Sequence, residues 1–128
     1  MNDPKAPPRA SIGSPQLTDD GRILPIDVGP DFWSHAVNHH AEGRLAFAYR
    51  FERNTTTWEH HPQGEELVYV LSGAVDFVLE LPDGEKVVEL RGGEAYIVPR
   101  GVWHRQVVRA PGEIFFVTAG KGTQHRPV

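Results

Sequence analysis

A chain of 128 residues is large enough for one hydrophobic core but not for two, so a single domain is expected. The net charge of −4, without a basic cluster, gives no footprint for nucleic acid, and no apolar run approaches the roughly 18 residues of a membrane span. The absence of cysteine excludes disulfides and thiolate metal ligands and is typical of cytoplasmic proteins. The residues after Met1 lack the apolar segment of a signal peptide. We therefore expect a cytoplasmic protein that binds neither nucleic acid nor membrane.

The first part of the chain differs in composition from the rest. Residues 1–22 are rich in Pro, Ser, Gly, Asp and Arg and contain few side chains that a core could bury. Such a segment cannot recover the entropy lost on ordering by apolar burial alone. We predict a flexible N-terminal arm over 1–22, which orders against the domain or a partner subunit, and a single domain over 23–128.

From Leu45 onward the sequence shows the period of two that is typical of β-strands. Leu45, Phe47, Tyr49 and Phe51 alternate with small or charged residues, so they face one side. Turn residues such as Ser72-Gly73 and Pro82-Asp83-Gly84 separate the segments that follow. Further strands are predicted over 66–71, 74–81, 86–90, 95–98, 103–108 and 114–118. About eight short strands with no long helical pattern predict an all-β barrel or sandwich.

The seven histidines are many for so short a chain, and two of them lie in segments that can converge on one point. Residues two apart in a strand face the same side, so Glu59 and His61 can point inward while His60 points outward. Glu66 follows the turn after His61 and begins the next predicted strand, and His104 follows a Pro-x-Gly turn at the start of a third. Two imidazoles and one or two carboxylates are thus expected around one cavity.

These residue types favour a divalent metal ion. His61, Glu66 and His104 form a two-histidine, one-carboxylate set, which leaves positions on the ion for a substrate or oxygen. Glu59 would make the site richer in oxygen ligands and suited to Mn²⁺ or Fe²⁺, while still admitting Zn²⁺. We predict a divalent cofactor: iron, manganese, nickel or zinc.

Two spacings in the chain resemble the motifs of the cupin superfamily. The second cupin motif, Gly-x5-Pro-x-Gly-x2-His, is met at every position by Gly93, Pro99, Gly101 and His104, although the Asn that usually follows is Val108. The first motif keeps its frame in the following three residues: His61, Glu66 and Gly73. Its first His position holds Glu59, and its opening Gly position holds Arg53. The resemblance covers about Leu45 to Ala119.

The resemblance implies an all-β cupin jelly roll, a double-stranded β-helix built from two sheets. It also implies a metal, when one is present, held by three histidines and one glutamate. Carried over to this sequence, three of the ligands are His61, Glu66 and His104, and Glu59 stands at the fourth position. Three roles remain open for Glu59: a metal ligand, a catalytic general base beside a three-ligand metal, or a substitution that leaves the barrel without metal.

By phase along the strands, several other residues are expected to line the pocket. They share the side of the neighbouring ligands, and they are Val68, Val70, Tyr96, Val98 and Gln106. Tyr96 and Gln106 would supply polar groups that orient a ligand in an otherwise apolar pocket.

Three functions follow from this interpretation. The first is a metal-dependent enzyme acting on a small organic molecule, because small cupins include dioxygenases, sugar-acid isomerases and decarboxylases; dioxygenase-type chemistry is favoured slightly. The second is a non-catalytic barrel that binds a small ligand or metal as a sensor or storage site. The third is a structural dimer whose site has decayed. A homodimer is expected in each case, because open sheet edges need covering.

Overall fold

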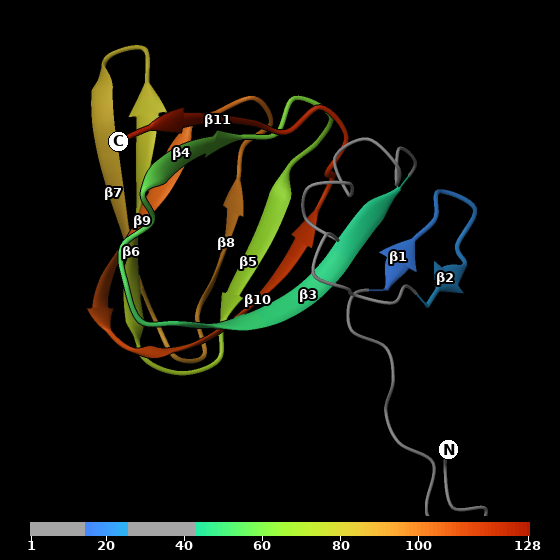
Figure 1. Ribbon diagram of the computed structural model, residues 1–128, viewed down its shortest axis with the longest axis horizontal. Helices are drawn as coiled ribbons and strands as arrows, with labels where there is room; N and C mark the ends of the chain where they lie inside the picture. The colour runs from blue at the N-terminus through green and yellow to red at the C-terminus, as the bar shows by residue number, and fades with distance from the viewer. Residues whose placement is uncertain (1–14, 26–42) are drawn as a thin grey trace, which may run out of the picture.

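The computed structural model describes residues 15–25 and 43–128, which form two antiparallel sheets (Figure 1). The six-stranded sheet has the order β2 (Ile23–Leu24), β1 (Gln16–Leu17), β3 (Arg44–Phe51), β10 (Gly112–Thr118), β5 (Glu66–Val70) and β8 (Ala95–Val98). The five-stranded sheet has the order β11 (Gln124–Pro127), β4 (Thr57–His60), β9 (His104–Ala110), β6 (Ala74–Leu81) and β7 (Gly84–Arg91). Neither described range contains a helix long and apolar enough to cross a membrane.

The all-β architecture predicted from the alternating pattern is confirmed. Each strand predicted between residues 66 and 118 is present, as β5 to β10, and the alternating segment that begins at Leu45 forms β3. Consecutive strands do not always pair: β3 lies beside β10, and β9 lies between β4 and β6. β9 and β10 follow each other in sequence but belong to different sheets, so the chain passes from one sheet to the other between them.

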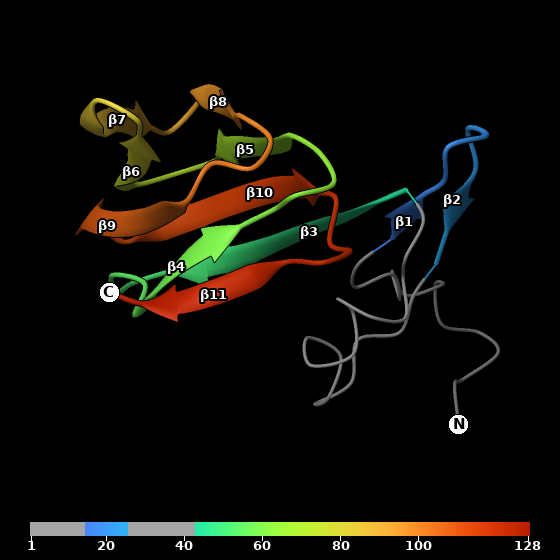
Figure 2. The ribbon, with the colours of Figure 1, turned by 90° about the horizontal axis from the view of Figure 1, so that it is seen from above.

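The predicted N-terminal arm is described only in part. Residues 1–14 lie outside the described residues, as do residues 26–42 of the predicted domain. Within the arm, Gln16 and Leu17 pair in antiparallel register with Leu45 and Arg44 and extend the six-stranded sheet. Figures 1 and 2 both place β1 and β2 beside one end of β3, away from the other strands.

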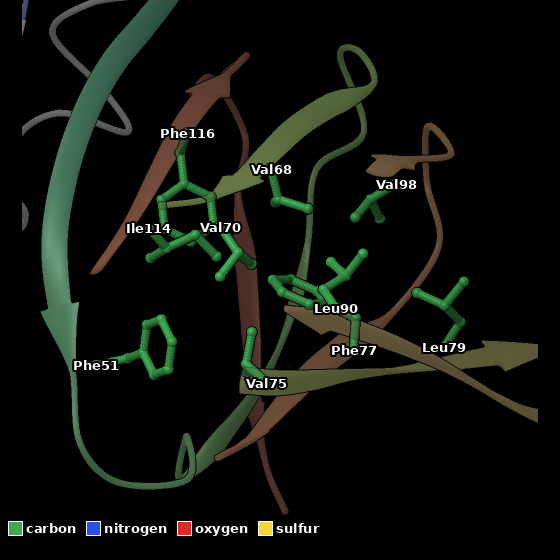
Figure 3. Close-up of a cluster of buried hydrophobic side chains, with 10 residues drawn as sticks. All are labelled: Phe51, Val68, Val70, Val75, Phe77, Leu79, Leu90, Val98, Ile114 and Phe116. Carbon is green, nitrogen blue, oxygen red and sulfur yellow. The ribbon is translucent and has the colours of Figure 1, made fainter. Parts of the chain in front are cut away.

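The core lies between the two sheets, where one face of each is apolar. Ten buried residues form it: Phe51, Val68, Val70, Val75, Phe77, Leu79, Leu90, Val98, Ile114 and Phe116 (Figure 3). Both sheets contribute, since Phe77 comes from β6 and Ile114 from β10. Burying each such side chain stabilises the fold by about 1.5–3 kcal/mol. This packing fixes the sheets relative to each other and therefore the residues at the ends of their strands.

Candidate metal centre

Four side chains from three strand ends meet at one end of the core. Glu59 belongs to β4, His61 follows it, Glu66 begins β5 and His104 begins β9. The Nε2 atom of His61 lies 3.0 Å from Glu66 Oε2 and 3.3 Å from Glu59 Oε1, and His104 Nε2 lies 3.3 Å from Glu66 Oε1. One ligand atom each from Glu59, His61 and His104 lies within 4.8 Å of the others. The structure thus brings together all four residues that the sequence indicated.

The outer nitrogen of each imidazole is already engaged. His104 Nδ1 lies 2.9 Å from the carbonyl of Val102, which can only accept, so Nδ1 carries the proton of the neutral ring. His61 Nδ1 lies 2.9 Å from Thr123 Oγ1. The same arrangement orients histidines that ligate metals, since it leaves Nε2 available to an ion.

Both Nε2 atoms are buried, and in the neutral rings, with the proton on Nδ1, neither finds a hydrogen-bond donor among the described residues. Each faces a Glu66 oxygen at 3.0 or 3.3 Å. Two lone pairs that face each other at this distance repel, and a buried polar atom without a partner is costly. A cation or a proton between them removes both penalties. The donor set therefore fits a divalent metal of the nitrogen- and oxygen-binding class.

The charges of the site shift two pKa values in opposite directions. Burial alone would raise the pKa of Glu66, but in the metal-free site, where a proton lies between Nε2 and the carboxylate, hydrogen bonds and positive charge from His104 and His61 outweigh burial and hold this pKa at about 2. Burial alone would lower the pKa of His104, but the Glu66 carboxylate outweighs it and raises this pKa. Glu66 is therefore a carboxylate across the physiological range, as a metal ligand must be.

The Glu66 carboxylate also accepts a hydrogen bond from a residue other than the two histidines. The hydroxyl of Thr118, the last residue of β10, donates to Glu66 Oε2 at 2.6 Å, and both side chains are buried. Such contacts to a ligand fix its orientation and raise metal affinity. Sequence reasoning did not identify Thr118 or Thr123, because neither belongs to a spacing motif.

Two turns are tied to each other and set the distance between the histidines. The amide of Gly101 donates to the carbonyl of His61 at 3.0 Å, and Arg100 Nε donates to the carbonyl of Pro62 at 2.7 Å. Gly101 has φ of 71°, a conformation that residues with a Cβ rarely adopt. The Pro-x-Gly turn therefore positions His104 at the start of β9 and is hydrogen-bonded to the backbone of His61 and Pro62.

A cavity of about 370 Å³ opens beside the four side chains. Glu59, His61 and Glu66 line it, and the other residues of its wall are Leu45, Phe47, Tyr49, Gln106, Phe116, Thr118, Gly120, Thr123 and His125. Of the residues predicted for the pocket, Gln106 lies on this wall. The inward side of β3 contributes Phe47 and Tyr49, which the alternation had placed on one face.

The structure places the other predicted pocket residues in or against the core. Val68, Val70 and Val98 are almost fully buried in the hydrophobic cluster, and Tyr96 packs against it. Val68 and Val70 follow Glu66 in phase along β5, but they lie deeper in the barrel, where Phe77 and its neighbours fill the space (Figure 3). Phase predicts the face of a strand, whereas depth along the strand is set by packing.

Two further histidines differ in where they lie. His60 is on the other side of β4 from Glu59, as its phase predicts, and it packs on Trp103 with ring centroids 4.9 Å apart. His125, which the sequence left outside the motifs, lines the cavity and lies 4.0 Å from Glu59. It arrives there because β11 pairs with β4, with His125 opposite Glu59.

Comparison with known proteins agrees with this architecture. The sequence pattern of the family described as Cupin domain matches residues 49–118, more than half of the chain. The Bacillus subtilis (strain 168) protein YdbB, described as uncharacterized, is 30% identical over 69 residues, which cover 54% of each chain. The chain thus spans about half the length of this curated relative.

Solved structures of low sequence identity share the fold. One is the oxalate decarboxylase of Bacillus subtilis, described with Mn(II) centers, at a TM-score of 0.55 and 15% identity over 66% of this chain and 24% of that one. Another is the hydroquinone 1,2-dioxygenase of Sphingomonas sp. TTNP3 with 4-hydroxybenzoate bound, at a TM-score of 0.51 and 19% identity over 59% and 58% of the two chains. At these identities the similarity shows the fold alone.

Proposed function

The chain belongs to the cupin family, and from this premise we propose that it binds one divalent metal ion and acts on a small organic molecule in the adjoining cavity. The proposed ligands are His61, Glu66, His104 and Glu59. The cofactor is iron, manganese, nickel or zinc, and the favoured reaction class is of the dioxygenase type. The proposed enzyme is cytoplasmic.

One observation carries the proposal. In the neutral rings the Nε2 atoms of His61 and His104 are buried without a hydrogen-bond donor among the described residues, and they face the carboxylate of Glu66 at 3.0 and 3.3 Å. When bound, the ion would supply Lewis acidity and, as iron or manganese, redox chemistry. Two proteins of similar fold, described as an oxalate decarboxylase with Mn(II) centers and a dioxygenase, support this class of function.

The proposed roles of the two glutamates differ because one side chain is buried and the other is partly exposed. Glu66 is buried and its carboxylate accepts a hydrogen bond from the Thr118 hydroxyl, so its proposed role is to hold the ion in a fixed position. The side chain of Glu59 is 37% exposed and lines the cavity, so it can exchange a proton with a bound molecule as well as contact the ion. Among the proposed ligands, Glu59 is the group suited to act as a catalytic base.

The test is metal content measured by mass spectrometry on protein purified without an affinity tag or chelator. We expect close to one equivalent of iron, manganese, nickel or zinc in the natural protein and its loss in His61→Ala and His104→Ala. His60→Ala is the matched control, because His60 is the neighbour of His61 but packs on Trp103. It should keep its metal.

Two results would contradict the proposal. Protein that contains no metal and takes up none on titration would remove the metal centre. Equal metal content in all three variants would place the ion elsewhere. Ligand binding without turnover in the loaded protein would favour the non-catalytic alternative, a sensor or storage barrel, over the enzyme.

A further inference from the structure

The cavity beside the metal centre has features that select the chemistry of its occupant. We propose that it takes a small, uncharged, single-ring molecule bearing one carbonyl or hydroxyl oxygen, and that the side-chain amide of Gln106 binds that oxygen. This inference rests on the proposed function for the claim that the bound molecule reacts. The claim that the molecule binds does not depend on it. Three properties of the wall support it: shape, hydrogen bonding and charge.

The six-stranded sheet supplies an aromatic wall. Tyr49 and Phe116 stack with ring centroids 5.3 Å apart and an interplanar angle of 7°, and Phe47 stacks on Phe116 at 5.1 Å and 23°. Phe47 and Phe116 are register partners on β3 and β10, so the strand pairing holds the rings in place. At these separations the rings stack face against face, and together they form an apolar aromatic wall that favours an aromatic ligand. A volume of about 370 Å³ is at the small end for ligand cavities, which suits one ring.

Opposite this wall, the five-stranded sheet supplies an oriented amide. Gln106 is buried on β9, two residues after His104, and its Oε1 accepts a hydrogen bond from the Tyr49 hydroxyl at 2.9 Å. Gln106 lines the cavity, and with Oε1 engaged by Tyr49 the Nε2 group is the part of its amide left to donate to a ligand. Burial raises the pKa of Tyr49 to about 12, so its hydroxyl remains a donor. Gln106 thus offers an N–H to a ligand oxygen.

The charge of the wall disfavours an anion. Glu59 and Glu66 both line the cavity, whereas none of the described lining residues is a Lys or an Arg. Two carboxylates and one divalent ion sum to zero. Glu59 stands where the cupin motif has a histidine, which lowers the charge of the centre by one. An anionic ligand would find no Lys or Arg counter-charge on the part of this wall that the structure describes.

The test uses three probes of similar shape and size: acetophenone, benzoate and isopropylbenzene. They share the ring and differ in the substituent, which is a neutral ketone, a carboxylate or an apolar branch. Binding is measured by titration calorimetry and ligand-observed NMR on zinc-loaded and metal-free protein. We expect acetophenone to bind at least about 10-fold more tightly than benzoate, because benzoate would lose the hydration of its charge without gaining a Lys or Arg counter-charge from the wall.

Variants of the wall separate the contributions. Gln106→Leu should weaken acetophenone by about 3- to 10-fold and leave isopropylbenzene unchanged, the effect of one hydrogen bond. Tyr49→Phe keeps the ring and removes the hydroxyl that orients Gln106, so it should also lower the preference for acetophenone over isopropylbenzene. This variant tests the role of Gln106 even if Gln106→Leu fails to fold. Glu59→Gln should tighten benzoate at least about 3-fold. Glu65→Gln, an equal change of net charge at an exposed neighbour, should not.

The inference is overturned if benzoate or isopropylbenzene binds as tightly as acetophenone, or if no probe binds. Metal content is read on the same samples, so the two proposals fail separately. Selectivity for acetophenone in protein that takes up no metal would refute the metal centre alone. Bound metal without selectivity would refute the inference alone.

Discussion

Single residues of the centre differ in how far the sequence could predict them. His61, Glu66 and His104 are predictable, because their spacing to neighbouring turn residues fixes where they lie on their strands. Thr118 and Thr123 are not, since their partners are 52 and 62 residues away in sequence and depend on how the sheets assemble. A hydroxyl that orients a ligand leaves no local pattern.

At this scale, Thr118→Val tests whether the contact to Glu66 matters. Valine has nearly the same shape, so the fold should persist while the carboxylate loses a hydrogen bond. We expect metal affinity to fall by about 10-fold or more, as is usual when a group that orients a ligand is removed. Competition with a chelator of known affinity measures the change. Thr56→Val is the control, because Thr56 is exposed and outside the cavity wall; an equal loss there would refute the role of Thr118.

The charges of Glu66 and His104 predict a pH dependence for the metal-free protein. The pKa of Glu66 is lowered from 4.5 to about 2, so its contribution to stability is present above pH 4.5 and lost as pH falls towards 2. The pKa of His104 is raised from 6.5, so its contribution is present below pH 6.5 and lost as pH rises through the raised value. The pair therefore stabilises most between pH 4.5 and 6.5.

Thermal unfolding of chelator-treated protein checks this expectation. The melting temperature should fall from about pH 6 to about pH 9, and Glu66→Gln should flatten that slope. With metal present the trend should reverse, because the ion competes with the proton on His104 and binds better as pH rises. Parallel slopes in the natural protein and Glu66→Gln would contradict the assignment.

Among the elements, the turns were predictable and the last strand was not. Pro99 and Gly101 predict a tight connection between β8 and β9, and Gly93 predicts one between β7 and β8; the structure contains both. β11 is polar and exposed along most of its length, so its sequence gives no strand signal. It forms because β4 offers an open edge, and that pairing places His125 opposite Glu59.

Gly101→Ala tests the link between the Pro-x-Gly turn and the metal centre. A Cβ at this position would meet no atom closer than 3.7 Å, so the substitution strains only the backbone, by about 1–2 kcal/mol. We expect a lower melting temperature and weaker metal binding. Gly93→Ala imposes the same kind of strain at φ of 90° with open space around it. We expect Gly93→Ala to lower the melting temperature by a similar amount but to keep its metal affinity. If both variants lost metal affinity equally, the proposed link would be contradicted.

For the whole molecule, the alternating pattern and the turns were sufficient to predict an all-β barrel or sandwich, and the resemblance to the cupin motifs implied that it is built from two sheets. The order of strands within each sheet depends on long-range pairing, which no local pattern contains. The same limit applies to depth: Val68 and Val70 share the face of Glu66 but lie in the core. The homodimer expected from the sequence stays a proposal, which the mass of the protein in solution can test.

The central claim is that His61, Glu66, His104 and Glu59 hold one ion. Its most direct measurement is anomalous scattering from crystals grown with Mn²⁺ or Zn²⁺. We predict a single peak about 2.0–2.3 Å from Nε2 of both histidines and from the carboxylate of Glu66, with Glu59 within the same distance if it is a ligand and beyond it if it is only a base. A map with no peak among these side chains, or with peaks only at exposed carboxylates, would contradict the account.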